Sequence, residues 1–137
     1  MTQEDRELLK DLCARLPYGV KAHAENVDLD GTISALSLNS VFLLELHDWW
    51  NIEFIKPYLR PMSSMTEEEK RHISKIMCLR TYDDGVVHNM TYPVYTPYYV
   101  MEDCLSYLRS IHVDYSGLIE KNLALEAKEG MYNIKEK

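Results

Sequence analysis

The chain has few cysteines, and none is placed for a disulfide or metal framework. Cys13, Cys78 and Cys104 are an odd number in 137 residues, and no Cys-x-x-Cys spacing occurs. We therefore expect reduced thiols. No His-Glu-x-x-His sequence is present either, so the pattern predicts no bound metal and no cofactor. The histidines stand apart from one another, at His23, His47, His72, His88 and His112.

Glycine, basic residues and long apolar runs are also scarce. The five glycines are dispersed, which argues against a glycine-rich phosphate-binding loop. Lys and Arg number 15 against 22 Asp and Glu, and the resulting net charge of −7 argues against general binding of nucleic acid or of an anionic membrane. No apolar run is long enough to span a bilayer, and residues 1–7 lack the apolar core of a signal peptide. We expect a cytoplasmic protein without a membrane partner.

The sequence predicts an α+β fold in a single domain over residues 1–137, because this length is close to the commonest domain size. The residue pattern changes from strand-like to helix-like at residues 55–61, where Pro57 and Pro61 lack backbone donors and should interrupt a sheet. We divide the chain into three parts. They are a helix and strand-rich half (1–61), a helical half (62–127) and a mobile tail (128–137).

The first half reads as one helix followed by four strands. Thr2 is placed to cap a helix whose apolar stripe runs from Leu8 through Cys13. Short strands joined by tight turns follow, and Asp30-Gly31 is the strongest hairpin signal. The strands are expected at residues 20–25, 32–38, 41–47 and 52–55. Such an antiparallel meander forms one curled sheet or closes into an SH3-like barrel, and the sequence leaves both open.

Three helices are expected in the second half. Ser64 or Thr66 starts the first, because each has a Glu three residues later, the capping-box spacing. Residues 67–71 read as its solvated face. A Thr-Pro pair at residues 96–97 starts the second helix. Asp114 caps a short last helix that ends near residue 122.

Aromatic residues are the strongest signal of a working surface. Residues 80–97 form a long segment of unpredicted conformation, and its tyrosines favour order. Tyrosine gives a large contact area at low entropic cost, and one of two adjacent tryptophans in a strand faces outward. The alternative is that these rings cover the core. The predicted interaction surface consists of Trp49, Trp50, Tyr92, Tyr95, Tyr98 and Tyr99.

The leading functional hypothesis is a non-enzymatic protein that binds another protein or a second copy of itself. One alternative is an accessory protein that binds nucleic acid through a small β-barrel, although acidic residues 67–69 adjoin its basic residues. That basic patch would consist of Lys56, Arg60, Lys70 and Arg71.

The other alternative is an enzyme with an unrecognised Cys/His or carboxylate site. No motif marks a nucleophile, and Cys13 and Cys104 fall on apolar stripes, where thiols are inert. We assign no catalytic residue.

Four stretches of the chain carry a resemblance: residues 12–20 (LCARLPYGV), 55–68 (IKPYLRPMSSMTEE), 113–121 (VDYSGLIEK) and 123–127 (LALEA). They resemble short uncharacterised proteins of gut Bacteroides-type bacteria, often encoded in phage or prophage-like regions. Residues 80–99 depart from that pattern. The resemblance implies a cytoplasmic context and a mobile-element origin, and it carries no activity or catalytic residue.

Overall fold

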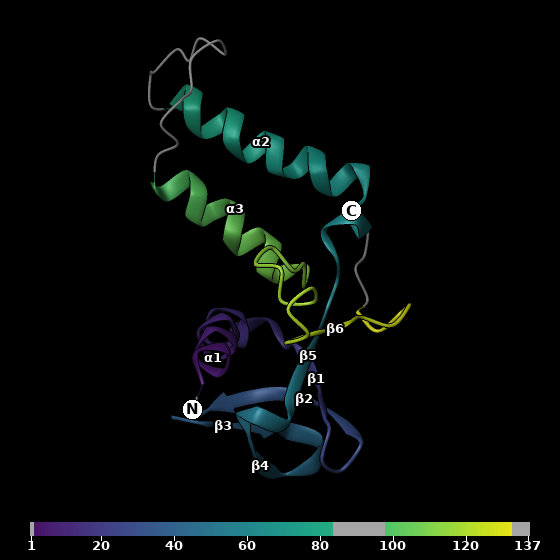
Figure 1. Cartoon of the computed structure of the whole chain (residues 1–137). Coiled ribbons are helices and arrows are strands. Elements are labelled where there is room, and N and C mark those ends of the chain that lie inside the picture. Colours follow the sequence, from purple (N-terminus) through teal and green to yellow (C-terminus); the bar gives the residue numbers. More distant parts are fainter. Residues whose placement is uncertain (1, 84–97, 133–137) are drawn as a thin grey trace.

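The computed structural model describes residues 2–83 and 98–132, without the side chains of 77–83 and 98–99. In Figure 1 the sheet and α1 lie at one end, and α2 and α3 lie side by side at the other. The predicted α+β class is confirmed. Over the described residues the elements are α1 (Gln3–Arg15), β1 (Lys21–Ala24), β2 (Leu29–Leu36), β3 (Ser40–Leu43), β4 (Asp48–Asn51), β5 (Ile55–Leu59), α2 (Glu67–Asp83), α3 (Tyr98–Ser110) and β6 (Leu125–Glu126).

The strands form one sheet in the order β4-β3-β2-β1-β5-β6, and only the β5–β6 pair is parallel. The four-strand prediction overlaps β1, β2 and β3 but is wrong about the fourth strand. β4 occupies the expected connection, and residues 52–54 form a 3-10 turn instead. The Asn51 side chain accepts the Glu53 N–H at 3.0 Å, and the Ile52 carbonyl accepts the Ile55 N–H. These local bonds replace strand pairing there.

β5 runs through Pro57, so the expected interruption of the sheet by proline is wrong. The Glu25 N–H donates to the Phe54 carbonyl at 2.8 Å, and alternation along this antiparallel ladder turns the Pro57 nitrogen away from β1. On the other side, β6 first pairs with β5 at Tyr58. Neither neighbouring strand therefore needs a hydrogen bond from the Pro57 nitrogen, so its missing N–H costs the sheet no pairing.

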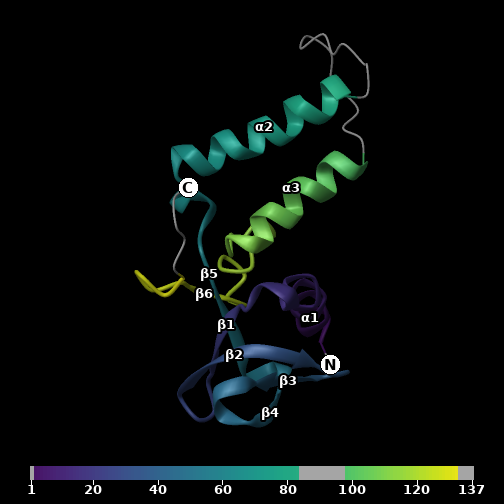
Figure 2. The same ribbon diagram turned by 180° about the vertical axis from the view of Figure 1, so that it is seen from behind.

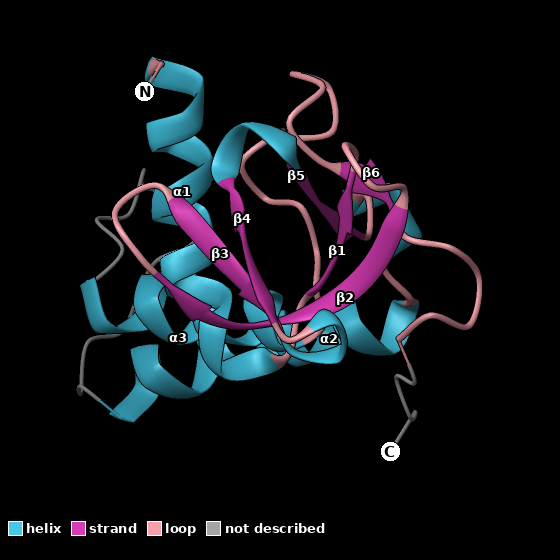
Figure 3. Ribbon diagram, turned by 90° about the horizontal axis from the view of Figure 1, so that it is seen from below, coloured by secondary structure: helices cyan, strands magenta, loops and turns pink. Residues whose placement is uncertain are grey.

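The sheet curls at β2, as Figure 3 shows. Leu29–Thr32 pairs with β1, whereas the part from Ile33 onward pairs with β3, and a register shift lies between Ile33 and Ala35. Gly31 permits the curl, because a Cβ there would lie 2.9 Å from the Cβ of Leu43. β4 and β6 remain the two ends of an open sheet. The alternative of a closed SH3-like barrel is therefore wrong.

Two capping boxes begin the first two helices where the sequence predicts them. The Thr2 hydroxyl accepts the Asp5 N–H at 3.0 Å, and the Asp5 carboxylate accepts the Thr2 N–H at 3.2 Å. The Thr66 hydroxyl accepts the Glu69 N–H at 3.1 Å, and the Glu69 carboxylate accepts the Thr66 N–H at 2.8 Å. Each box satisfies amide groups that a helix start leaves without intrahelical acceptors.

α1 buries a face that is half polar. Leu8 and Leu12 enter the main hydrophobic core, and Asp11 and Arg15 are buried on the same face. Residues three and four apart share a helix face, so this face excludes Cys13. The Cys13 thiol is exposed, and its expected burial is wrong.

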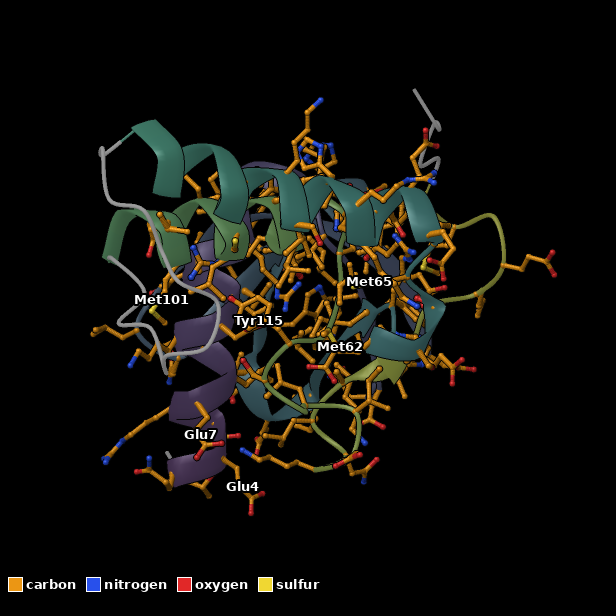
Figure 4. All side chains as sticks on the ribbon, turned by 90° about the horizontal axis from the view of Figure 1, so that it is seen from above. Glu4, Glu7, Met62, Met65, Met101 and Tyr115 are labelled. Atoms are coloured by element: carbon orange, nitrogen blue, oxygen red, sulfur yellow. The ribbon has the colours of Figure 1, made fainter. Side chains whose placement is uncertain are left out.

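Arg15 ties α1 to the segment that follows α3. Its side chain is completely buried, its Nε donates to the Asp11 carboxylate at 2.6 Å, and its Nη2 donates to the Val113 carbonyl at 2.8 Å. The guanidinium carbon lies 4.8 Å from the centre of the Tyr115 ring. Figure 4 shows Tyr115 beside α1, the helix that carries Glu7. One buried cation thus holds two distant segments together.

Arg60, just after β5, makes the corresponding connection to α2. Its two terminal nitrogens donate to the two Glu69 oxygens, each at 2.8 Å, and one also donates to the Ile111 carbonyl at 3.2 Å. Glu69 is buried, so its assignment to the solvated face of the helix is wrong. The hydrogen bonds from Arg60 lower the pKa of Glu69.

α2 and α3 pack side by side on a second, smaller core of buried Met65, Leu108, Ile111 and Val113. Figure 2 shows this helical pair from behind, extending away from the sheet.

The segment after α3 forms turns, so the predicted third C-terminal helix is wrong. The Asp114 carboxylate accepts the N–H groups of Leu118 and Ile119, both at 2.9 Å. Gly117 lies between Asp114 and Leu118 with φ +75°, a left-handed conformation that does not continue into a helix. Asn122 also has positive φ, but it lies in a turn and ends no helix, so the expected helix stop at that residue is wrong as well.

Tyr132 fastens the C-terminal segment to the sheet. Its ring stacks on His112 with centroids 3.7 Å apart, and its hydroxyl donates to the Tyr58 carbonyl at 2.7 Å. The same hydroxyl accepts the Lys21 N–H at 2.8 Å. Residues 133–137 lie outside the described part of the chain, and mobility from residue 128 onward stays a prediction.

We predict that Arg15→Met destabilises the protein by about 3–5 kcal/mol, because Asp11 then remains as a buried charge without its partner. The double variant Arg15→Met, Asp11→Leu should recover most of this loss. Urea unfolding of the wild type, of Arg15→Met, of Asp11→Leu and of the double variant gives the free energies of unfolding to compare. A loss below about 1 kcal/mol in Arg15→Met, or no recovery in the double variant, would contradict the role given to Arg15.

Candidate functional site

Trp49 lies on the outward face of β4, directly opposite Phe42 of β3. The two rings meet edge to face with centroids 5.3 Å apart, and the His47 ring lies 6.5 Å from Phe42. Trp49 remains 47% exposed. We call Phe42, His47 and Trp49 the aromatic cluster. It presents a rigid, partly exposed aromatic surface, the kind that often anchors protein contacts.

The other predicted surface residues do not join this cluster. Trp50 is half-buried opposite Val41 and packs against the main core, with its indole nitrogen buried and without a hydrogen-bond partner. Tyr92 and Tyr95 lie outside the described residues, as do the side chains of Tyr98 and Tyr99. Sequence reasoning missed Phe42, although its place opposite a tryptophan could have been read from the turn between the two strands.

β4 also offers an unpaired backbone edge. The Ile52 N–H donates to the Asn39 carbonyl at 2.8 Å, which fixes the alternation of the β3–β4 ladder. Trp49 and Asn51 therefore direct their backbone groups away from β3. The Asp48 carboxylate accepts the Trp49 N–H at 2.7 Å. Over the described residues, the Asn51 N–H and the Trp49 carbonyl are left at the edge, where a further strand would pair, whereas the Asn51 carbonyl begins the 3-10 turn of residues 52–54.

A polar cluster of His23, Asp28, Asp30 and Tyr58 links the two strands of the β1–β2 hairpin to β5. The His23 ring approaches Asp30 at 2.6 Å through Nδ1 and Asp28 at 3.0 Å through Nε2, and the Tyr58 hydroxyl donates to Asp30 at 2.9 Å. Burial and the Asp30 carboxylate raise the pKa of Tyr58 to about 12. Burial opposes ionisation of Asp30, but hydrogen bonds from His23 and Tyr58 lower its pKa. Both imidazole nitrogens are engaged, so this cluster is built to stabilise the hairpin.

A cavity of about 350 Å³ lies between α1 and the turns after α3. Asp11 and Tyr115 line it together with Arg109, whose Nε donates to the Tyr115 hydroxyl at 2.8 Å. Burial raises the pKa of Asp11, and the Arg15 guanidinium opposes that rise. Asp11 is bonded to Arg15, and Arg109 to Tyr115 and Glu102, so each of these polar groups already has a partner and no free pair converges for catalysis among them.

The described thiols lack the surroundings of a nucleophile. Burial, and the nearby Asp103 carboxylate, raise the pKa of Cys104, whereas a reactive cysteine needs a lowered pKa. Cys13 is exposed on α1, and the Cys78 side chain lies outside the described residues. Within residues 2–83 and 98–132, no three His, Cys, Asp or Glu side chains gather as metal ligands. An enzymatic site stays a prediction without a structural feature behind it.

The predicted basic patch is largely neutralised by carboxylates. Lys56 lies 3.6 Å from Glu25, and Arg60 is the partner of Glu69. Lys70 lies 3.4 Å from Glu67 on the exposed surface of α2. Because these carboxylates compete with phosphates for the cations, the arrangement does not favour a nucleic-acid backbone.

His112 is a buried imidazole without a role in any converging site. Its Nδ1 has no hydrogen-bond partner, and the ring is only 8% exposed beneath Tyr132. Burial lowers the pKa of His112 to about 4, and the cations Arg15 and Arg60 add to this effect. The ring is therefore neutral at physiological pH and serves as a packing surface for Tyr132.

We predict that His112 makes the protein acid-labile. Its pKa is lower in the folded state than the usual 6.5, so the stabilisation is complete above about pH 6.5 and is lost as the pH falls toward 4. The reference is His112→Asn, because asparagine tolerates the positive φ of +64° at this position. Relative to that variant, the free energy of unfolding of the wild type should fall by about 3 kcal/mol between pH 7 and pH 4. Urea unfolding at several pH values measures the difference. Parallel pH profiles would contradict it.

Comparison of the chain with models of known families, with curated proteins and with solved structures finds no match. None of the described helices is long and apolar enough to cross a membrane.

Proposed function

We propose that this chain is a non-enzymatic, cytoplasmic protein that works by binding another polypeptide at the β4 edge. The observation that carries the proposal is the coincidence of two features on one short strand. The aromatic cluster supplies partly exposed rings, and the adjacent backbone of Trp49 and Asn51 supplies free hydrogen-bonding groups. In strand addition, backbone bonds give affinity and neighbouring side chains give specificity.

The other candidate sites among the described residues support this choice, because their polar groups are already bonded. The Asp11 cavity is lined by polar groups that already have partners, and both ring nitrogens of His23 are engaged by carboxylates. Self-association through the same edge is the alternative occupant within the proposed function. The resemblance to short proteins of Bacteroides-type bacteria makes a lysate of such a bacterium the appropriate source of partners, and we propose a mobile-element origin on that basis.

A matched pair of substitutions at Asn51 tests the edge. Asn51→Pro removes the outward N–H, and the native φ of −60° and ψ of 141° suit proline. Asn51→Ala keeps that N–H and loses the same side-chain cap of Glu53, so it is the control. We predict that a partner captured from lysate is retained by wild type and Asn51→Ala, lost with Asn51→Pro, and weakened by about 2 kcal/mol or more in Trp49→Ala.

Site-specific photo-crosslinking from position 44, which is exposed in the turn before β4, should label the captured partner, and sedimentation shows whether that partner is a second copy. Equal retention by Asn51→Pro, or the absence of any captured chain together with a monomer that does not crosslink, would overturn the proposal. Circular dichroism and thermal unfolding of both Asn51 variants establish that each is folded before binding is compared.

A further inference from the structure

The negative charge of the protein is concentrated in the part that carries β4. Between Lys21 and Lys56 there is no Lys or Arg, whereas this stretch holds six carboxylates. The remaining 16 of the 22 carboxylates are nearly balanced by the 15 Lys and Arg. Almost all of the net charge of −7 therefore comes from residues 22–55, which include β2, β3 and β4. The six are Glu25, Asp28, Asp30, Glu45, Asp48 and Glu53.

Three of these carboxylates have a basic side chain close by, and the other three bracket β4. Glu25 lies 3.6 Å from Lys56, Asp30 lies 3.7 Å from Lys128, and Asp28 lies 3.0 Å from the His23 ring. Glu45 accepts hydrogen bonds from the Thr32 amide and hydroxyl, both at 2.7 Å, and Asp48 accepts the Trp49 N–H. Over the described residues, neither these two nor Glu53 forms an ion pair with a Lys or Arg.

The bracketing carboxylates stand at both ends of the strand. Glu45 lies in the turn that enters β4, Asp48 is its first residue, and Glu53 follows its last residue by two positions. A second copy added antiparallel would place the Asp48 end of one strand beside the Glu53 end of the other. Like charges would then meet at both ends of the pair, which disfavours self-association.

Resting on the proposed function, we infer that the segment added to β4 is an extended, Lys- or Arg-bearing strand of another protein. Its backbone pairs with Trp49 and Asn51, and its cations neutralise the bracketing carboxylates at the strand ends. A side chain on its outward face lies against Trp49, whose exposed ring accepts a cation over its face. Charge, aromatic surface and free edge thus select the same chemical class of partner.

The test uses the full chain and three short capped peptides. One alternates Lys with Thr and forms a strand, one alternates Glu with Thr, and one is the Lys/Thr peptide with its backbone amides N-methylated, which keeps the charge but leaves no amide donor for pairing. We expect the Lys/Thr peptide alone to shift the backbone amide resonances of residues 48–52. Its affinity should fall about tenfold in the double variant Asp48→Asn, Glu53→Gln. It should remain unchanged in the double variant Glu67→Gln, Glu68→Gln, which removes the same charge from exposed positions on α2, at the opposite end of the molecule from β4 (Figure 1).

Several results would overturn the inference. Equal binding of the N-methylated Lys/Thr peptide would mean unspecific charge attraction, and equal binding of the Glu/Thr peptide would mean an edge without preference for cations. A dimer that Asn51→Pro dissociates would make a second copy the occupant. In the last two cases the proposed function stands and only the inference fails. If no peptide moves the β4 resonances and the wild type remains a monomer, both fail.

Discussion

The fold depends on a buried guanidinium. Arg15 is surrounded by groups from two distant parts of the chain, since Asp11 is its neighbour on α1 and Val113 lies beyond α3. A buried cation is costly unless acceptors are placed for its donors, and the Nε and Nη2 donors of Arg15 find theirs in one relative position of α1 and the C-terminal segment. The requirement is directional, whereas the contacts of Leu8 and Leu12 with the core are not.

Arg60 continues the same polar seam between the two hydrophobic cores. Its backbone N–H donates to the His112 carbonyl at 2.7 Å, and its carbonyl accepts the Asp114 N–H at 2.7 Å. Its guanidinium then fixes Glu69 at the start of α2. The seam orients the helical pair relative to the sheet through charged hydrogen bonds. Over the described residues, the curled half of the sheet has no such connection at its far end, and β4 is left there as an edge.

The sequence indicates local features well and long-range partners poorly. The capping boxes at Thr2 and Thr66 were predictable, because each needs only residues three apart. The outward position of one tryptophan followed from strand alternation. The pairs that organise the fold could not be read in this way, since Arg15 meets Val113 at a separation of 98 residues. Glu69 was assigned to solvent for the same reason, because its partner Arg60 lies before the helix and outside its periodicity.

These buried pairs also determine which surface is available to bind a partner. Among the described residues, the chemically capable side chains Asp11, Arg15, Arg60 and Glu69 are bonded to one another, so they give stability and orientation. Over the described residues, the unpartnered buried side-chain groups are Nη1 of Arg15, Nε1 of Trp50 and Nδ1 of His112, which are closed off from solvent and cannot meet a substrate. The outward backbone groups of β4 lie instead at an open edge of the sheet. Edge strands need protection from unwanted pairing, and here Asp48 both occupies the Trp49 amide and adds negative charge. This device repels a second acidic copy and leaves the edge open to a cationic strand.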